Sequence, residues 1–447
     1  MTGALRRTLG FKDLVFLTLG TVIGSGIFLV PAVVLRQTGG SLKIALAVWL
    51  IGGLLSFLGA LTYAELGAMN PDAGGLYSYI RDAFGPLPAF LYGWASIAVI
   101  ASGSIAALAV AFSNYLGQLI PIGPVGARIV SVVVIAVIAL INIRGTRESS
   151  SVENWATGAK VGALLVLSIA LIALGHGSAD TSAPAVVPPT SLFAGLGGAM
   201  IGILWAYEGW QYVTFSAGET RDPQRVFPRA IAVATAALIF LYIIANLGYV
   251  AALGTNAAAA SDHVAADAMR AVFGPLSGKF FSGLVLVSIF SAANGVMLTA
   301  PRLYYSMARD GVFFSRLARV SERFGTPVSA IVLLAGWSAL LAASGTFEQL
   351  LTYVVFAGWI FYGLGAMSVF SSRRKHADAP RPFRTPGYPV TPLLFVASAA
   401  LLVLNTLREQ PTRALIGLSV VLLGTPAFYL WRARSRRAAL DAPLPTT

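Results

Sequence analysis

The chain has 447 residues, of which 57% are hydrophobic and only 11% are charged, with a formal net charge of +13. Soluble domains carry about 25% charged residues, so this composition indicates an all-α protein that crosses a membrane several times. Cysteine is absent, which excludes disulfides, thiolate metal sites and cysteine nucleophiles. The three histidines lie far apart in expected loops, and hydrolase, metalloprotease and nucleotide-binding motifs are absent. We therefore expect no enzyme, no catalytic residues, no metal and no cofactor.

Twelve apolar runs are long enough to cross a bilayer as helices, which takes about 20 residues each. The first follows a short basic arm, residues 1–13, without a convincing cleavage site, so we interpret it as an uncleaved span. We expect one transmembrane domain over residues 1–447, with short surface helices in the outer loop at 251–271. The predicted spans cover residues 14–34, 44–68, 87–116, 125–143, 155–174, 192–215, 230–253, 280–301, 328–343, 350–370, 393–407 and 414–431.

The distribution of positive charge predicts the orientation in the membrane. With the spans placed as above, most of the 31 Lys and Arg residues fall on the side of the N-terminus. Because Lys and Arg favour the cytoplasmic side, we expect a multi-pass plasma-membrane protein with both termini in the cytoplasm. The positive charge thus orients the protein rather than binding nucleic acid. The expected partners are the lipid bilayer and a small substrate, and we infer no obligatory protein partner.

The first span carries Gly24-Ser25-Gly26 at its centre, where a helix is weakest because glycine loses the most backbone entropy on ordering. Unwound backbone at membrane depth is tolerated where it lines a cavity. We predict a break here, with the N–H groups of the following half-helix facing an anion such as a carboxylate. The alternative is that Gly20 and Gly24 form a small-residue face for helix packing.

The sixth span repeats this feature at Trp205-Ala206-Tyr207-Glu208-Gly209, where a carboxylate and a glycine do not suit a continuous lipid-facing helix. A helix that ends near Tyr207 presents its last carbonyl groups to an ammonium group. The two breaks together are complementary to the two ends of an α-amino acid. Interrupted helices five spans apart also predict an inverted repeat, with residues 12–175 and 191–372 as its halves and residues 388–432 as two added helices.

Two ionisable residues lie inside predicted spans and are functional candidates for that reason. Glu208 is interpreted as a pocket-lining or proton-responsive group, and the alternative is a carboxylate paired with a freed amide or a basic neighbour. Lys160 is expected to lie against the first break, where its charge replaces a metal ion; alternatively, it snorkels to the cytoplasmic interface. Ser291 in the eighth span is a candidate neighbour of Lys160.

Other charged residues are expected to stabilise the fold or gate it. Glu65, near the end of the second span, is expected to be a structural anchor. The segments 219–223 and 308–311 begin cytoplasmic loops, and we expect gating or packing salt bridges there.

Four motifs extend this reading: Gly24-Ser25-Gly26-Ile27-Phe28; Tyr63-Ala64-Glu65-Leu66 with Asn70-Pro71 and Gly74-Gly75; Ala206-Tyr207-Glu208-Gly209-Trp210; and the run from Arg302 to Gly311. In this order they resemble the amino acid–polyamine–organocation superfamily, and within it bacterial members close to the L-type amino acid transporters. The resemblance implies a LeuT-type fold of five plus five inverted helices with two added, twelve in all, in which helices one and six are discontinuous. It also implies an alternating-access carrier of amino acids.

The resemblance further implies roles for individual residues. The substrate carboxylate would meet the amides around Ser25 and Gly26. The α-amine would meet carbonyls near Val22 in the first span, and near Trp205 and Glu208 in the sixth. The lysine of the fifth span stands where sodium-coupled relatives bind an ion, which implies sodium-independent transport.

Two positions depart from the family pattern, since Trp205 replaces the usual Phe of the gate and Glu208 stands where relatives have Gly or Asp. Both departures bear on side-chain specificity, and Glu208 also bears on proton coupling. The candidate coupling site consists of Lys160 and Ser291. The candidate substrate site comprises Val22, Ile23, Gly24, Ser25, Gly26, Ile27, Trp205, Ala206, Tyr207, Glu208 and Gln211.

We expect a secondary active transporter of amino acids, in particular neutral L-amino acids, that works by alternating access without sodium. The L-type resemblance favours exchange, whereas a titrating Lys160 would favour proton coupling. One alternative is a transporter of polyamines or cationic amino acids, in which Glu208 pairs with a second cationic group. Another is a non-transporting amino acid sensor, which is expected to need a substantial cytoplasmic tail, whereas residues 432–447 are all that follow the last predicted span.

Overall fold

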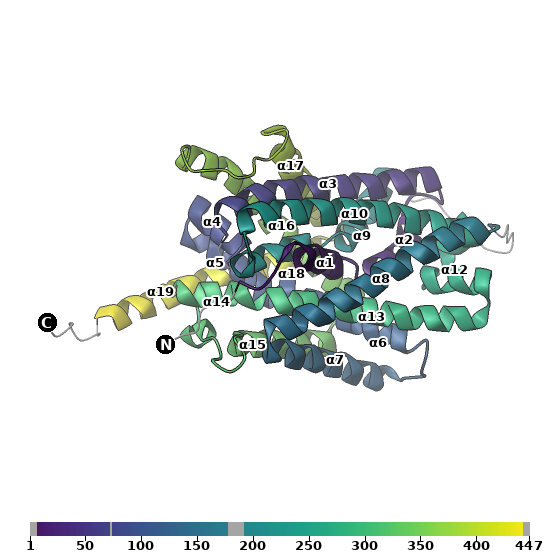
Figure 1. Cartoon of the computed structure of the whole chain (residues 1–447), viewed down its shortest axis with the longest axis horizontal. Coiled ribbons are helices and arrows are strands. Elements are labelled where there is room, and N and C mark those ends of the chain that lie inside the picture. The colour runs from purple at the N-terminus through teal and green to yellow at the C-terminus, as the bar shows by residue number, and fades with distance from the viewer. Residues whose placement is uncertain (1–6, 72–73, 178–191, 441–447) are drawn as a thin grey trace.

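The computed structural model describes residues 7–71, 74–177 and 192–440, and these form a bundle of long helices that run roughly along one axis (Figure 1). Residues 1–6 of the predicted basic arm, residue 191 at the start of the predicted second repeat and residues 441–447 of the tail lie outside these described residues. The helices of the first half are α1 Phe11–Val22, α2 Gly26–Gln37, α3 Leu42–Met69, α4 Leu76–Phe84, α5 Pro86–Ala95, the π-helical η1 Ser96–Ile100, α6 Ala101–Leu116, α7 Pro124–Arg144 and α8 Thr146–Leu174. Those of the second half are α9 Leu192–Ala206, the 3-10 helix η2 Trp210–Glu219, α10 Pro223–Leu253, α11 Thr255–Ala260, α12 Val264–Phe273, α13 Pro275–Thr299, α14 Pro301–Arg309, the 3-10 helix η3 Ser315–Ala318, α15 Val328–Ser344, α16 Phe347–Lys375, α17 Val390–Glu409, α18 Pro411–Leu422 and α19 Gly424–Leu440.

Each of the twelve predicted spans lies within one helix or a run of consecutive helices. In the described part of the chain, nine helices are long and apolar enough to cross a membrane, or ten if the bent pair α1 and α2 is one span. The helices of the two remaining predicted spans, the sixth and the ninth, are shorter. α9 has 15 residues and ends where the second break begins, and α15 has 17 residues. The chain is therefore an all-helical polytopic membrane protein, and the surface helices expected at 251–271 are confirmed as α11 and α12.

The outer surface of the bundle is rich in large apolar side chains. Soluble proteins bury such residues and expose charged ones, whereas here the longest helices expose leucine, isoleucine and valine along their outward faces. This arrangement suits a surface that faces lipid. Examples are Leu50 and Ile51 of α3, Val125 and Ile129 of α7, and Leu401 and Leu404 of α17.

The broken helices lie at the centre of this bundle, where α1 and α9 are enclosed by longer helices (Figure 1). α10 packs against α1, α3 and α8, while α13 packs against α1, α6 and α8. α2, the second half of the first broken helix, packs directly on α9, the first half of the sixth predicted span. The polar interruptions in these two helices therefore face protein rather than lipid, as non-helical backbone at this depth requires.

Candidate functional site

The first break separates α1, which ends at Val22, from α2, which begins at Gly26, and the two helix axes are bent by 46°. The Ile23 N–H still donates to Leu19 O at 2.8 Å, and the Gly24 N–H donates to Val22 O at 2.8 Å, so α1 closes in a tight turn. The first N–H groups of an α-helix have no partner within that helix. The start of α2 therefore presents donors and a positive partial charge at the break.

The second break follows Ala206, the last residue of α9, and precedes η2. Gly209 makes this turn with a φ of 131°, which residues with a side chain rarely adopt. A Cβ atom at Gly209 would lie 2.9 Å from the backbone carbon of Thr21, so the turn also packs directly against α1. The C-terminal end of α9 leaves carbonyl groups and a negative partial charge beside the first break.

The start of α2 and the end of α9 are in direct contact. A Cβ atom at Gly26 would lie 2.5 Å from Ala206 Cα, so only glycine fits between the two half-helices. The Tyr242 hydroxyl of α10 lies 2.9 Å from Ala206 O and 3.2 Å from Val22 O, and it donates to these carbonyls at the ends of α9 and α1. Sequence reasoning missed Tyr242, because a tyrosine within an apolar run carries no distinctive signal.

A small cavity of about 20 Å³ lies between the two breaks. A water molecule needs about 10–15 Å³ by this measure, so an amino acid can enter only if the surrounding helices move apart. Six of the predicted substrate residues line the cavity: Val22, Gly24, Ser25, Gly26, Trp205 and Glu208. Six further residues that sequence reasoning missed also line it: Thr21, Ser104, Leu108, Gly209, Tyr212 and Val296.

Glu208 and Ser25 bring unpaired polar oxygens to this cavity lining. Glu208 Oε1 accepts a hydrogen bond from the Tyr362 hydroxyl at 2.9 Å and from Gln211 Nε2 at 3.5 Å. Glu208 Oε2 and Ser25 Oγ are buried without a hydrogen-bond partner in the described part of the chain. An unpaired buried polar atom is costly, so both oxygens are suited to meet donor groups of a bound molecule.

The other predicted substrate residues lie outside the cavity wall. Ile23, Ile27, Ala206, Tyr207 and Gln211 are fully or almost fully buried and do not line it. The Tyr207 ring packs against the rings of Trp49 and Tyr242, with centroid separations of 5.8 and 4.9 Å. These residues therefore support the two half-helix ends through packing.

Lys160 lies halfway along α8 and directs its amine to the first break. Its Nζ donates to Gly20 O at 2.6 Å, to Ile23 O at 2.8 Å and to Ser288 O at 3.4 Å. The residue is 3% exposed, so it does not snorkel to an interface. The two glycine interpretations of the first span are compatible, because Gly20 packs against α8, while Gly24 lies within the break and packs against Leu108 and Ala292.

Ser291 does not bond to Lys160. Its hydroxyl instead donates to Oε1 of Glu153, which precedes Lys160 by about two turns of α8, at 2.9 Å. Sequence reasoning missed Glu153 because the fifth span was expected to begin at residue 155, whereas α8 begins at Thr146. The spacing of Glu153 and Lys160, seven residues apart on one helix, was the available signal.

Ion pairs and a backbone bridge close the bundle on the side where α4 and α14 lie. Leu9 pairs with Thr220 in a parallel bridge. Glu219 pairs with the buried Arg302 at 3.0 Å. Asp310 pairs with Arg81 at 2.6 Å, and its carboxylate also accepts a hydrogen bond from the Tyr77 hydroxyl at 2.8 Å. Burial, followed by this hydrogen bond, raises the pKa of Tyr77, so its hydroxyl remains a donor.

The expected anchor role of Glu65 is visible in its contacts. Its carboxylate accepts two hydrogen bonds from Arg373, at 2.8 and 2.7 Å, and one from the Thr385 N–H at 2.7 Å. Glu65 is fully buried, and these bonds join α3 to α16 and to the segment that precedes α17. Trp205, which lines the small cavity, meets the Phe347 ring edge-on, with the ring centroids 6.0 Å apart.

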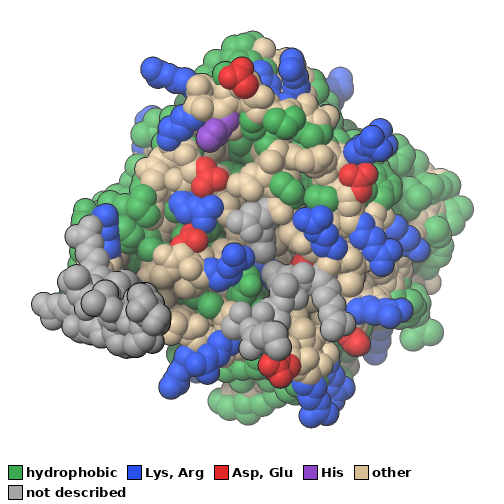
Figure 2. All heavy atoms as spheres, turned by 60° about the vertical axis from the view of Figure 1, so that its left-hand side comes forward, with side chains coloured by type: hydrophobic (Ala, Val, Ile, Leu, Met, Phe, Trp, Pro, Cys, Tyr) green, Lys and Arg blue, Asp and Glu red, His purple; other side chains and the backbone are tan. Residues whose placement is uncertain are grey.

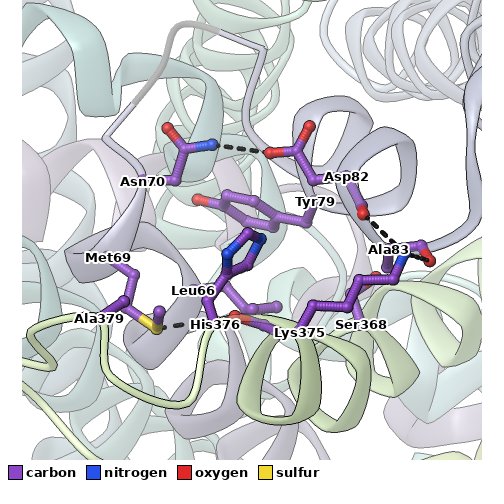
Figure 3. Close-up of a pocket in the computed structure, with 11 residues that line it drawn as sticks. Leu66, Met69, Asn70, Tyr79, Asp82, Ala83, Ser368, Lys375, His376 and Ala379 are labelled. Carbon is purple, nitrogen blue, oxygen red and sulfur yellow. Dashed lines mark hydrogen bonds between the residues drawn. The ribbon is translucent and has the colours of Figure 1, made fainter.

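A larger cavity of about 200 Å³ lies where α3, α4 and α16 end (Figure 3). Asn70 Nδ2 donates to Asp82 Oδ2 at 3.0 Å, and Lys375 Nζ donates to Ala83 O at 2.8 Å. Figure 3 shows the rings of Tyr79 and His376 among the side chains that line this cavity. The cavity meets neither helix break, so it lacks the paired partial charges that the smaller cavity has, and the smaller cavity is the better candidate for a substrate site.

Comparisons with known proteins show which family the chain resembles. A family model described as amino acid permease matches residues 9–425. The serine/threonine exchanger SteT of Bacillus subtilis is 29% identical over 433 residues, which cover 96% of this chain and 98% of the relative. The human cystine/glutamate transporter is 30% identical over 93% of this chain and 83% of its own length. The mouse large neutral amino acids transporter small subunit 2 is 30% identical over 96% of this chain and 81% of its own length.

Proposed function

The chain belongs to the amino acid permease family, and on this premise we propose that it exchanges amino acids across the plasma membrane by alternating access, without sodium. The observation that carries the proposal is the direct apposition of the start of α2 and the end of α9 across the small cavity. One helix end offers N–H donors and the other offers carbonyl acceptors, and this pair complements a zwitterion.

The substrates named for the relatives support a site that recognises the α-amine and α-carboxylate of an amino acid. The names of these relatives cover serine and threonine, cystine and glutamate, and large neutral amino acids. These substrates differ in their side chains and have only the α-amine and α-carboxylate in common. A site made of backbone groups at the two breaks fits that common part, while Trp205, Glu208 and Leu108 stand where they can select the side chain.

Sodium independence is supported by the contacts of Lys160. Its ammonium group donates to two carbonyls of α1 around the first break and to one of α13. A metal ion at this place would need the same carbonyl oxygens as ligands. The side chain thus occupies the position and supplies the charge that a coupling cation would otherwise supply.

The proposed architecture is an inverted repeat of five plus five helices, with two added. Four pairs of helices support it, because each joins predicted spans that are five apart. α2 packs on α9, α3 on α10, α6 on α13 and α7 on α15. Helices that lie beside the axis of a two-fold repeat are expected to pack on their own counterparts in this way.

We propose that the end of the bundle that holds α4, α14 and α19 faces the cytoplasm. Charged side chains on this end are mostly Lys and Arg (Figure 2). The last turns of helices that end here are basic, as at Arg81 of α4, Arg144 of α7, Arg309 of α14 and residues 373–375 of α16. Positive charge on one side favours the cytoplasmic orientation of that side. The Glu219–Arg302 and Asp310–Arg81 pairs are then candidates for an inner gate.

A second candidate substrate class is supported by Glu208. Its Oε2 atom is buried in the cavity lining without a partner, so a cationic side chain or a polyamine could pair with it. Transport of cationic amino acids is therefore the alternative to transport of neutral ones.

The test is counterflow with the purified chain alone in liposomes. Vesicles are loaded with a mixture of unlabelled amino acids, and entry of labelled serine, leucine, glutamate, arginine and putrescine is followed separately. We expect entry of at least one amino acid that requires internal amino acid. Entry of putrescine alone would favour the polyamine alternative, and binding without entry would favour a sensor. Because one relative is named a small subunit, activity of the chain alone also tests whether it needs a partner.

A further inference from the structure

Lys160 and Glu153 are two buried opposite charges on one face of α8. They are seven residues apart, which is about two helical turns, so their side chains leave the helix in nearly the same direction. Glu153 is 1% exposed and Lys160 is 3% exposed. No ion pair in the described part of the chain joins them directly. Instead, Gly20 of α1 lies between them, because its carbonyl accepts from Lys160 and a Cβ atom added to it would overlap the Glu153 carboxylate.

The hydrogen bonds of Lys160 suit a charged amine. An ammonium group has three N–H donors and no acceptor. Lys160 has three carbonyl acceptors, on Gly20, Ile23 and Ser288. A neutral amine would have only two donors and would leave one of these bonds unmade.

The hydrogen bonds of Glu153 suit an ionised carboxylate, which only accepts. Oε1 is within reach of the hydroxyls of Ser291 at 2.9 Å and Thr157 at 3.3 Å. Oε2 accepts from Asn294 Nδ2 at 3.0 Å. The Asn294 amide is oriented for this bond because its Oδ1 accepts from Asn142 Nδ2 at 2.9 Å. A chain of polar groups from α7, α8 and α13 therefore holds the carboxylate against α1.

Uncharged groups surround the pair on the facing helices, namely Ser288, Ser291 and Asn294 of α13 and Asn142 of α7. Most titratable residues of the packed helices are exposed or bonded elsewhere. They are Asp13 of α1, bonded by Asn154; Lys12 of α1, Arg128 and Arg144 of α7, Arg147 and Glu148 of α8, Arg225 and Arg229 of α10, and Lys279 of α13, all exposed; Tyr242 of α10, bonded to Val22 and Ala206; and Asp267 of α12, paired with Arg270. Tyr249 of α10 is buried without a hydrogen-bond partner in the described part of the chain, and its neighbour Gly248 packs on Ser168 of α8, about two turns beyond Lys160.

We infer that Glu153 is the counter-ion that keeps Lys160 permanently charged, so that Lys160 acts as a fixed cation beneath the first break and neither releases nor takes up a proton during transport. The inference rests on the proposed exchange function and specifies how the lysine serves it. A buried charge is costly unless an opposite charge and hydrogen bonds compensate it. Without the negative charge of Glu153, Lys160 would therefore lose its proton easily. With that charge beside it, Lys160 stays protonated.

The test compares the pH dependence of exchange in wild type, Glu153→Gln and Glu148→Gln. The second variant removes an exposed carboxylate of the same helix and is the matched control. Internal and external pH are kept equal and varied from about pH 6 to about pH 9. We expect constant exchange for wild type and Glu148→Gln. For Glu153→Gln we expect exchange that falls as pH rises, by about tenfold per pH unit above the midpoint.

The double variant Glu153→Gln, Lys160→Met separates this electrostatic role from a structural one. Any residual exchange should no longer depend on pH, because the group that titrates has been removed. A uniformly lowered but flat profile for Glu153→Gln would contradict the counter-ion role, as would wild-type exchange that falls with pH. Should Glu153→Gln not fold, protection of wild type from heat by its substrate should be constant over this pH range, and a decline would contradict the role. Absence of exchange by wild type at every pH would instead contradict the proposed function.

Discussion

Gly26→Ala tests the contact between the two half-helices on which the proposed substrate site depends. The added Cβ atom would lie 2.5 Å from Ala206 Cα and 2.7 Å from Ala206 Cβ. Carbon atoms pack at about 3.5–4.0 Å, so the two helix ends must move apart by about 1 Å. Neither partner atom belongs to a flexible side chain, and the strain therefore falls on the backbone that forms the site. The cost of such overpacking is about 1–3 kcal/mol.

A misplacement of about 1 Å in a binding or catalytic geometry can cost about 100-fold in rate. We expect Gly26→Ala to fold and insert but to lower kcat/KM for amino acid counterflow by about that factor. Gly336→Ala is the matched control, because an added Cβ atom on this exposed glycine of α15 meets nothing within 4 Å. Elution of the variant as a single species in detergent would establish that it is folded. Wild-type kinetics for Gly26→Ala would refute the reasoning.

Three further predictions follow from other contacts. Tyr242→Phe removes the donor shared by Val22 O and Ala206 O, at a cost of about 1–3 kcal/mol, and should lower Tm measurably; an unchanged Tm would contradict this role. Arg302→Met leaves Glu219 buried without its partner and should cost about 3–5 kcal/mol, whereas Arg81→Met breaks a partly exposed pair worth about 0–1 kcal/mol; equal Tm losses would argue against the difference in burial. Glu208→Gln should retain exchange of neutral amino acids and abolish any exchange of arginine, and retained arginine exchange would remove Glu208 from the recognition of cations.

The positions of the helices and of both breaks could be predicted from the sequence, because long apolar runs and mid-span glycines have few stable arrangements in lipid. α1 and α9 end at Val22 and Ala206, close to the expected points. The partners of single polar groups could not be predicted in this way. Tyr242 and Glu153 were missed because their roles depend on which helices pack together, and hydropathy along the chain does not specify that packing.

The start of α8 illustrates the same difficulty. Residues 146–154 are polar and were assigned to a loop, yet they continue the helix, since their polar side chains bond to α7 and α13. A hydropathy run ends where polar residues begin, even when those residues are buried by a neighbouring helix. The partners of Glu219 and Asp310, which are Arg302 and Arg81 rather than adjacent residues, likewise depend on the tertiary fold.

The central claim is that this chain exchanges amino acids with Lys160 in place of a coupling cation. It is tested most directly by uptake of a labelled substrate into proteoliposomes, with sodium or choline outside, with and without an inward proton gradient, and with or without internal amino acid. The account predicts uptake that requires internal amino acid and is equal in sodium, in choline and under the proton gradient. Uptake into empty vesicles that is driven by sodium or by the proton gradient would contradict it.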